Sequence, residues 1–135
     1  MFLQRHPLQK LGAIYAGGVV GALIRVGLAE RFPHSAATWP WPTFAVNMVG
    51  AVLIGYYFAS FRDHSPAQLH HPFFATGICG TLTTFSTLQL ELYNQVDAGH
   101  LPLAVAYCAT TIALGYLAVR LGIAIEARGN PEVAA

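Results

Sequence analysis

The sequence predicts an all-α membrane protein with four transmembrane helices in a single domain over residues 1–135. Two observations predict this class. Hydrophobic residues make up 55% of the chain and charged residues only 10%, whereas a soluble domain usually carries about 25% charged residues. The apolar residues are also gathered into four segments, each close to the roughly 20 residues that a helix needs to cross the hydrocarbon core.

The four predicted spans are residues 11–29, 43–61, 73–93 and 103–125, followed by a polar tail over 126–135. A proline stands just before each of the last three spans, where it suits the first turn of a helix: Pro42, Pro72 and Pro102. The N-terminus resembles a signal peptide, with two positive charges before an apolar run. No small-residue cleavage site follows and the run continues, so we predict a retained first span.

The net charge is +1 and the basic residues are scattered, which gives no case for a nucleic-acid partner. Lys and Arg in short loops set the orientation of membrane proteins. In a four-span layout, five of these residues fall on the side of the termini: Arg5, Lys10, Arg62, Arg120 and Arg128. Arg25 and Arg31 fall on the other side. The bias weakly favours termini in the cytoplasm.

Small residues punctuate the spans, and Gly17 and Gly21 form a GxxxG pattern in the first. Such residues let membrane helices approach closely. The glycines alone are equally consistent with generic helix packing. A chain with four short helices has little interior in which to build a pathway for a solute, so we expect it to oligomerise.

The third span, within "ATGICGTLTTFSTLQLELYN" (Ala75–Asn94), carries residues that weaken a helix in its middle: Gly77, Gly80, Thr81, Thr83 and Thr84. Irregular backbone at membrane depth is tolerated only inside protein or beside a wet cavity. Broken helices also form ion sites, because freed carbonyls bind cations and a half-helix N-terminus attracts anions. A simple kink relieved by threonine hydroxyls is the alternative, and the spacing leaves both open.

Hydroxyl side chains continue past this point on two helical faces, one with Thr83, Ser86 and Thr87, the other with Thr84, Thr87 and Glu91. Hydroxyls can replace the water of an anion without a charge that would trap it. Asn47 in the second span adds an amide donor, and the edge of a phenyl ring such as Phe85 is weakly positive. Hydrogen bonding between helices is the alternative role of the hydroxyls.

Two charged residues lie within or near the spans, Arg25 and Glu91. Charges at membrane depth are costly and are usually functional or paired. Arg25 is also placed so that it could reach the interface. Glu91 could pair with a cation, accept a backbone hydrogen bond or relay protons.

Three stretches, "GGVVGALIR" (Gly17–Arg25), "WPTFAVNMVG" (Trp41–Gly50) and "GICGTLTTFSTLQLE" (Gly77–Glu91), resemble the signatures of the Fluc-type fluoride channels, also called CrcB proteins. The resemblance covers almost the whole chain. It implies a passive fluoride-selective channel, not an enzyme, that exports fluoride through the bacterial cytoplasmic (inner) membrane and protects against its toxicity. It also implies a broken third helix and an antiparallel, dual-topology homodimer with two pores, so the partners are a second copy, fluoride and membrane lipid.

The same resemblance implies the site residues. A structural Na⁺ at the dimer interface would be held by the backbone carbonyls of Gly80 and Thr83. The motif charges are Arg25 and Glu91. The fluoride pathway would comprise Asn47, Phe85, Leu88, Ser86, Thr87, Tyr107 and Thr111.

The third stretch departs from the family's usual GGFTTFSTF, since here it reads "GTLTTFSTL". Thr81 replaces a glycine, and Leu82 and Leu88 replace phenylalanines. Leu88 removes one of the two ring edges expected along the pathway, and leucine has no quadrupole to stabilise an anion. We therefore expect slower conduction.

Two other functions remain open at this level. A small proton-coupled multidrug exporter also has four spans, but it needs a central carboxylate in its first span, and here none precedes Glu30. The other alternative is a non-conducting subunit of a heterodimeric channel, because Leu88 departs from the family's pathway residue.

Overall fold

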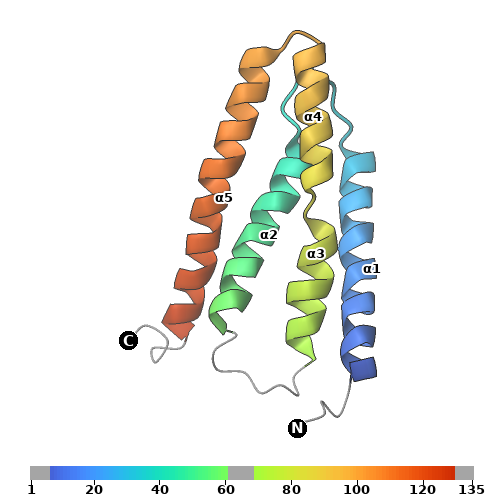
Figure 1. The fold of residues 1–135 in the computed structure, drawn as a ribbon, viewed down its shortest axis with the longest axis vertical. Helices are drawn as coiled ribbons and strands as arrows, with labels where there is room; N and C mark the ends of the chain where they lie inside the picture. Colours follow the sequence, from blue (N-terminus) through green and yellow to red (C-terminus); the bar gives the residue numbers. More distant parts are fainter. Residues whose placement is uncertain (1–6, 61–68, 130–135) are drawn as a thin grey trace.

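The computed structural model describes residues 7–60 and 69–129, and this part of the chain is helical. Its elements are α1 (Pro7–Arg31), α2 (Trp41–Ser60), the π-helical segment η1 (Pro72–Ile78), α3 (Cys79–Leu82), α4 (Phe85–Asp97) and α5 (Leu101–Gly129). They form four rods side by side, because α3 and α4 follow one another along a single rod (Figure 1). The prediction of an all-α protein with four rods is confirmed.

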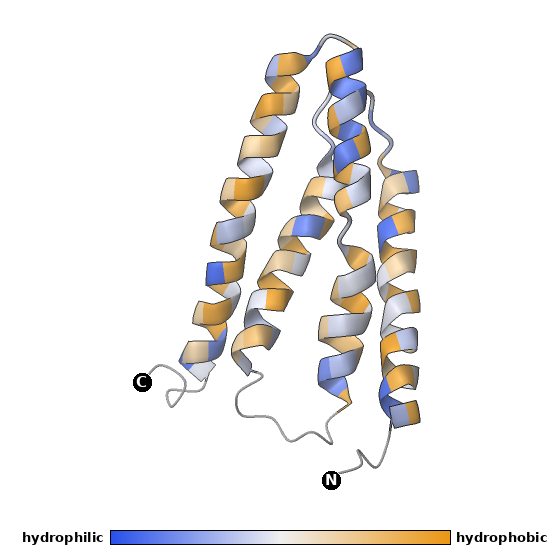
Figure 2. Ribbon diagram, in the orientation of Figure 1, coloured by the Kyte–Doolittle hydropathy of each residue, from blue (hydrophilic) through white to orange (hydrophobic). Residues whose placement is uncertain are grey.

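Three of the rods, α1, α2 and α5, are long and apolar enough to cross a membrane. The other rod is divided into shorter pieces. Hydrophobic residues recur along the whole length of α1 and α5 (Figure 2), and many large apolar side chains on these two helices are exposed. A protein in water would bury such a surface, whereas lipid solvates it. The chain is a multi-pass membrane protein.

The first, third and fourth rods extend beyond the predicted spans at both ends, and α2 begins two residues before its predicted span, because a helix continues into the polar flanks of an apolar run. α5 continues to Gly129, so it includes the first residues of the predicted polar tail, and Glu126 is buried. Residues 130–135 lie outside the described part of the chain, as do Arg5 and Arg62 of the predicted charge bias.

Glycines bring the rods into backbone contact. A Cβ at Gly77 would lie 2.7 Å from the Ile14 carbonyl oxygen and 2.9 Å from the Gly17 Cα. A Cβ at Gly21 would lie 2.6 Å from the Ile78 carbonyl oxygen. No real Cβ comes this close, so α1 can pack on η1 and α3 only because these positions are glycine. The predicted close approach at Gly17 and Gly21 is confirmed.

The contact between α2 and α5 supplies a test of this packing. A Cβ at Gly122 would overlap the Val52 carbonyl oxygen and lie 2.7 Å from the Tyr56 backbone nitrogen. We expect Gly122→Ala to lower the free energy of unfolding by about 1–3 kcal/mol, because the two backbones must separate. Thermal unfolding in detergent micelles measures this.

Gly115→Ala on the same helix is the matched control. A Cβ there meets only the terminal methyl of Met48, at 3.7 Å. We expect little change from it, and equal losses in the two variants would contradict backbone contact as the cause.

Candidate functional site

The third rod is interrupted at Thr83 and Thr84, which both leave helical backbone, with φ/ψ of −75°/151° and −150°/118°. The Thr83 amide and hydroxyl both donate to the Cys79 carbonyl oxygen, at 3.2 and 2.8 Å. The Thr84 hydroxyl accepts from the Thr87 amide at 3.2 Å and caps α4. The interruption predicted from the glycines and threonines is confirmed, and a kink in a continuous helix does not describe it.

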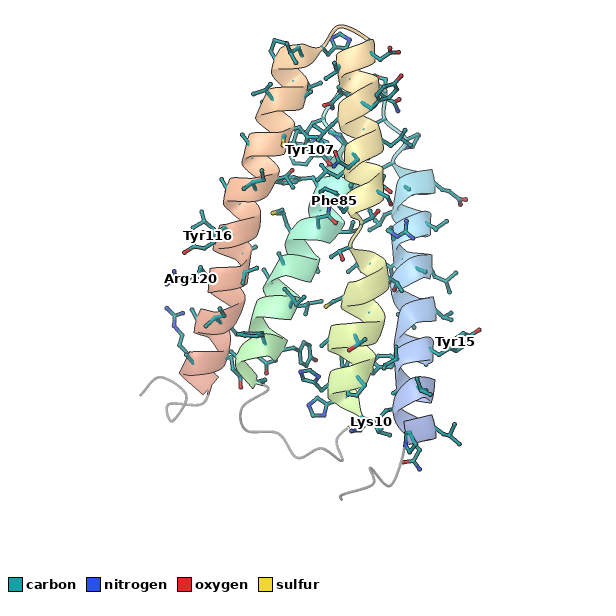
Figure 3. The ribbon with its side chains drawn as sticks, in the orientation of Figure 1. Lys10, Tyr15, Phe85, Tyr107, Tyr116 and Arg120 are labelled. Carbon is teal, nitrogen blue, oxygen red and sulfur yellow. The ribbon has the colours of Figure 1, made fainter. Side chains whose placement is uncertain are left out.

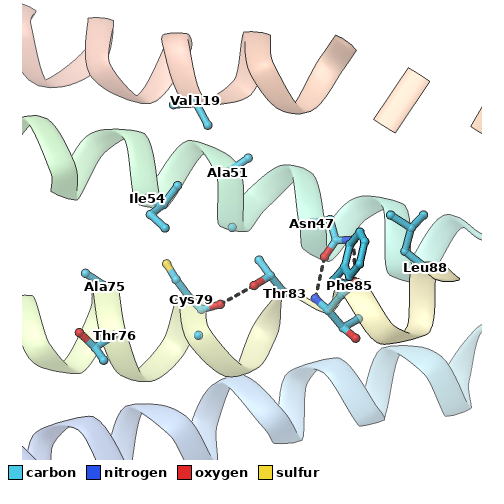
Figure 4. A pocket seen from close by; sticks show the side chains of 13 residues that line it. Asn47, Ala51, Ile54, Ala75, Thr76, Cys79, Thr83, Phe85, Leu88 and Val119 are labelled. Atoms are coloured by element: carbon cyan, nitrogen blue, oxygen red, sulfur yellow. Dashed lines mark hydrogen bonds between the residues drawn. The ribbon is translucent and has the colours of Figure 1, made fainter. Parts of the chain in front are cut away.

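Asn47 on α2 satisfies the backbone that this interruption frees. Its Oδ1 accepts from the Thr84 amide at 2.8 Å, and its Nδ2 donates to the Thr84 carbonyl oxygen at 3.2 Å (Figure 4). One side-chain amide thus replaces the peptide partner that a continuous helix would supply. Such replacement is required where no water reaches the backbone.

Arg25 lies beside the end of α3, where its Nε donates to the Thr81 carbonyl oxygen at 2.9 Å. A cation here is favoured by the negative end of the helix dipole. Arg25 lies with Arg31 in the last two turns of α1, and its side chain is directed to the interruption of the third rod.

Glu91 is the centre of a second polar cluster, with a side chain only 7% exposed. Its Oε1 accepts from the Thr43 hydroxyl at 2.5 Å and lies 3.3 Å from His34 Nε2. Its Oε2 accepts from the Tyr107 hydroxyl at 2.8 Å. The carboxylate therefore joins α2, α4, α5 and the segment after α1.

An open groove of about 620 Å³ runs along α2 and the third rod (Figure 4). Five residues predicted for the pathway or the sodium site line it: Asn47, Gly80, Thr83, Phe85 and Leu88. The Phe85 ring is largely uncovered, with 71% of the residue exposed. The structure thus brings these positions from α2, α3 and α4 onto one surface.

The other predicted pathway residues lie elsewhere. Ser86 is exposed, and Thr87 borders a separate cavity of about 270 Å³ with Arg25 and Thr43. Tyr107 is fully buried between α4 and α5 on the Glu91 carboxylate (Figure 3). The Thr111 hydroxyl is buried and has no partner among the described residues.

The predicted face of Thr83, Ser86 and Thr87 is wrong, because Thr83 lies in the extended link and not on α4. The second face is correct in part. Thr84 caps the helix on which Thr87 and Glu91 lie, and its hydroxyl also donates to the Thr87 hydroxyl at 3.0 Å.

The carbonyls proposed to hold sodium fit that ion. Within residues 7–60 and 69–129, the carbonyl oxygens of Gly80 and Thr83 receive no hydrogen bond. Gly80 is exposed, and the space where its Cβ would stand is open. Backbone oxygens at a broken helix are the ligands that sodium takes in membrane proteins.

Sequence reasoning missed His34 and Thr43 as partners of Glu91. Thr43 stands in the first turn of a span, where a hydroxyl is unremarkable, and it lies 48 residues from Glu91 along the chain. His34 lies in a connecting segment, and no pattern in the sequence directs it to the carboxylate.

Comparison with known proteins agrees with this architecture. Residues 12–123 match the family described as "CrcB-like protein, Camphor Resistance (CrcB)". A protein of Mycobacterium bovis named "Fluoride-specific ion channel FluC 1" is 42% identical over 127 residues, which cover 93% of this chain and 96% of that protein. A Bacteroides fragilis protein named "Fluoride-specific ion channel FluC" is 35% identical over 81% of this chain and 89% of its own length. The chain belongs to the CrcB-like family.

Proposed function

We propose that this protein is a passive, fluoride-selective ion channel that exports fluoride from the bacterial cytoplasm across the inner membrane. The observation that carries the proposal is the similarity, over nearly the full length, to relatives named fluoride-specific ion channels. A passive channel makes and breaks no covalent bonds, so the protein is not an enzyme. Residues 1–135 would form one four-span membrane domain.

The pathway that we propose uses donors that the fold leaves available. The Asn47 amide nitrogen has two hydrogens, and only one is needed by the Thr84 carbonyl. The Phe85 ring edge stands open beside it, with the Ser86 and Thr87 hydroxyls on the following turn. Stepwise replacement of the water around fluoride by such groups would let a small anion pass.

The remaining pathway residues and the motif arginine complete the proposal. Leu88 lines the groove next to Phe85. Tyr107 and Thr111 on α5 have buried hydroxyls in a single chain, and their part in the pathway is proposed from the family resemblance. Arg25 retains guanidinium donors beyond its Nε and places a positive charge near the pathway, which raises the local concentration of anions.

We propose that the working unit is an antiparallel, dual-topology homodimer. A single chain leaves the groove open and Phe85 uncovered. A second copy on this face would cover both. Na⁺ at the interface would be bound by the Gly80 and Thr83 carbonyl oxygens. It would neutralise the partial negative charge of these oxygens at the point where the two chains meet.

The decisive experiment is fluoride efflux from liposomes that hold this purified protein alone, read with a fluoride electrode, with chloride as the control ion. Rapid efflux of fluoride only is expected. Efflux of both ions would contradict selectivity, and none from folded protein would favour a non-conducting subunit. The multidrug exporter gains no support, because the carboxylate of α1, Glu30, is exposed near the end of the helix.

Leu88 tests the contribution of an aromatic edge. Leu88 lines the groove beside Phe85, so a ring at this position would face the same space. We expect Leu88→Phe to increase fluoride efflux severalfold. The scale is that of an interaction with the edge of an aromatic ring, which contributes about 0.5–1.5 kcal/mol between two rings. Leu88→Met is the control for side-chain size. Equal flux in Leu88→Phe and the unmodified protein would show that the ring edge is not needed here.

A further inference from the structure

Thr81, near the end of α3, has a side chain that is directed to α1. Its hydroxyl donates to the Gly18 carbonyl oxygen at 2.8 Å. The same hydroxyl lies 3.1 Å from the Gly77 carbonyl oxygen and 3.4 Å from that of Ile78, so three oxygens compete for its single proton. The contact with Gly18 is the shortest of the three, and it joins two rods across 63 residues of sequence.

Glycines of α1 make room for this side chain. A Cβ at Gly21 would overlap the Thr81 hydroxyl oxygen. A Cβ at Gly18 would meet the Thr81 methyl group at 3.5 Å, which is an ordinary contact. The Thr81 hydroxyl therefore occupies space that a side chain at position 21 would fill, so the glycine on α1 and the threonine on α3 fit each other.

Arg25, one turn beyond Gly21 on α1, binds the same threonine through its backbone. The Arg25 Nε donates to the Thr81 carbonyl oxygen at 2.9 Å. Gly18, Gly21 and Arg25 follow one another at intervals of three and four residues, so they lie on one face of α1. One face of α1 thus binds Thr81 both at its side chain and at its carbonyl.

This double attachment restrains the peptide group that carries the Gly80 carbonyl. The Gly80 carbonyl and the Thr81 nitrogen belong to one planar peptide group, so the direction of the oxygen depends on the backbone angles of both residues. Gly80 has no side chain, and the space where its Cβ would stand is open. Glycine is also the residue with the least restricted backbone. Thr81 supplies the side-chain contact that Gly80 lacks.

We propose that Thr81 is a positioning residue for the sodium site: its hydroxyl, bound to Gly18, holds the Gly80 carbonyl in the orientation that binds the ion. The inference rests on the proposed function, in which the carbonyls of Gly80 and Thr83 bind Na⁺. Thr83 is restrained separately, because its own hydroxyl donates to the Cys79 carbonyl oxygen at 2.8 Å. The family's usual pattern has glycine in place of Thr81, and glycine has no hydroxyl to donate.

The test is thermal unfolding of the purified protein in detergent micelles over a series of Na⁺ concentrations, with N-methyl-D-glucamine keeping the ionic strength constant. An ion that binds only the folded protein raises the Tm once its concentration exceeds the Kd. Thr81→Val removes the hydroxyl, and we expect the rise in Tm to require about fivefold more Na⁺. This factor corresponds to about 1 kcal/mol, the usual contribution of one hydrogen bond.

Three further variants make the result specific. Thr81→Ala also lacks the hydroxyl but leaves space where valine fills it, so it should shift the Na⁺ dependence by a similar factor. Thr81→Ser keeps the hydroxyl and should keep the Na⁺ dependence of the unmodified protein. Thr110→Val is the matched control, because Thr110 is half-buried on α5, which packs on α2 and α4.

A purely structural role of Thr81 would lower the Tm by the same amount at every Na⁺ concentration. An unchanged Na⁺ dependence in both Thr81→Val and Thr81→Ala would therefore overturn the inference. If Na⁺ does not raise the Tm of the unmodified protein, the sodium site and this inference fail together. A protein that shows the expected Na⁺ dependence but conducts no fluoride in liposomes would contradict the proposed channel function and leave the role of Thr81 supported.

Discussion

Asn47→Asp is expected to abolish fluoride efflux. The carboxylate cannot donate to the Thr84 carbonyl oxygen, which the Asn47 amide now binds at 3.2 Å, and it adds a negative charge beside the pathway. A unit charge about 4 Å from an anion costs about 4 kcal/mol near a protein surface, which equals nearly a thousandfold. Initial rates of efflux from liposomes measure the loss.

Gln89→Glu is the control for this substitution, because it also adds one carboxylate through an amide-to-acid change, on an exposed position of α4 outside the groove. It should retain most of the efflux. Size-exclusion chromatography and thermal unfolding would establish that the Asn47→Asp protein is folded. If that folded variant conducts fluoride normally, Asn47 does not belong to the pathway.

Glu91→Leu is expected to cause the largest loss of stability, about 3–5 kcal/mol, the range for removing one partner of a buried charged cluster. It leaves the hydroxyls of Thr43 and Tyr107 without an acceptor, and Tyr107 is wholly buried. The cluster also joins α2, α4 and α5, so its loss loosens three rods. Reversible denaturation in detergent micelles measures the free energy of unfolding.

Two comparisons make this result specific. Tyr107→Phe removes only one donor and should cost about 1–3 kcal/mol. Combining Glu91→Leu with Thr43→Val and Tyr107→Phe replaces the carboxylate and both of its hydroxyl donors by apolar groups and should recover much of the loss. A triple variant that is less stable than Glu91→Leu alone would contradict the unpaired hydroxyls as the cause.

Much of the interrupted rod was predictable from residue types. Gly77 and Gly80, followed by Thr81, Thr83 and Thr84, predict a helix that fails in its middle, and the failure falls within that run. Which residues leave the helix was not predictable, because glycine at Gly80 remains helical while two threonines become extended. Their hydroxyls and the Asn47 amide supply the hydrogen bonds that make this arrangement possible in lipid.

The sequence by itself determined the class of the protein, its four apolar rods and its family, because these depend on composition, on the length of apolar runs and on short motifs. Only the tertiary structure decided what the polar residues do. Asn47 meets Thr84 across 37 residues, and Arg25 meets Thr81 across 56. Glu91 gathers Thr43, Tyr107 and His34. Hydrogen bonds at membrane depth depend on which rods lie side by side, and local sequence carries no record of that adjacency.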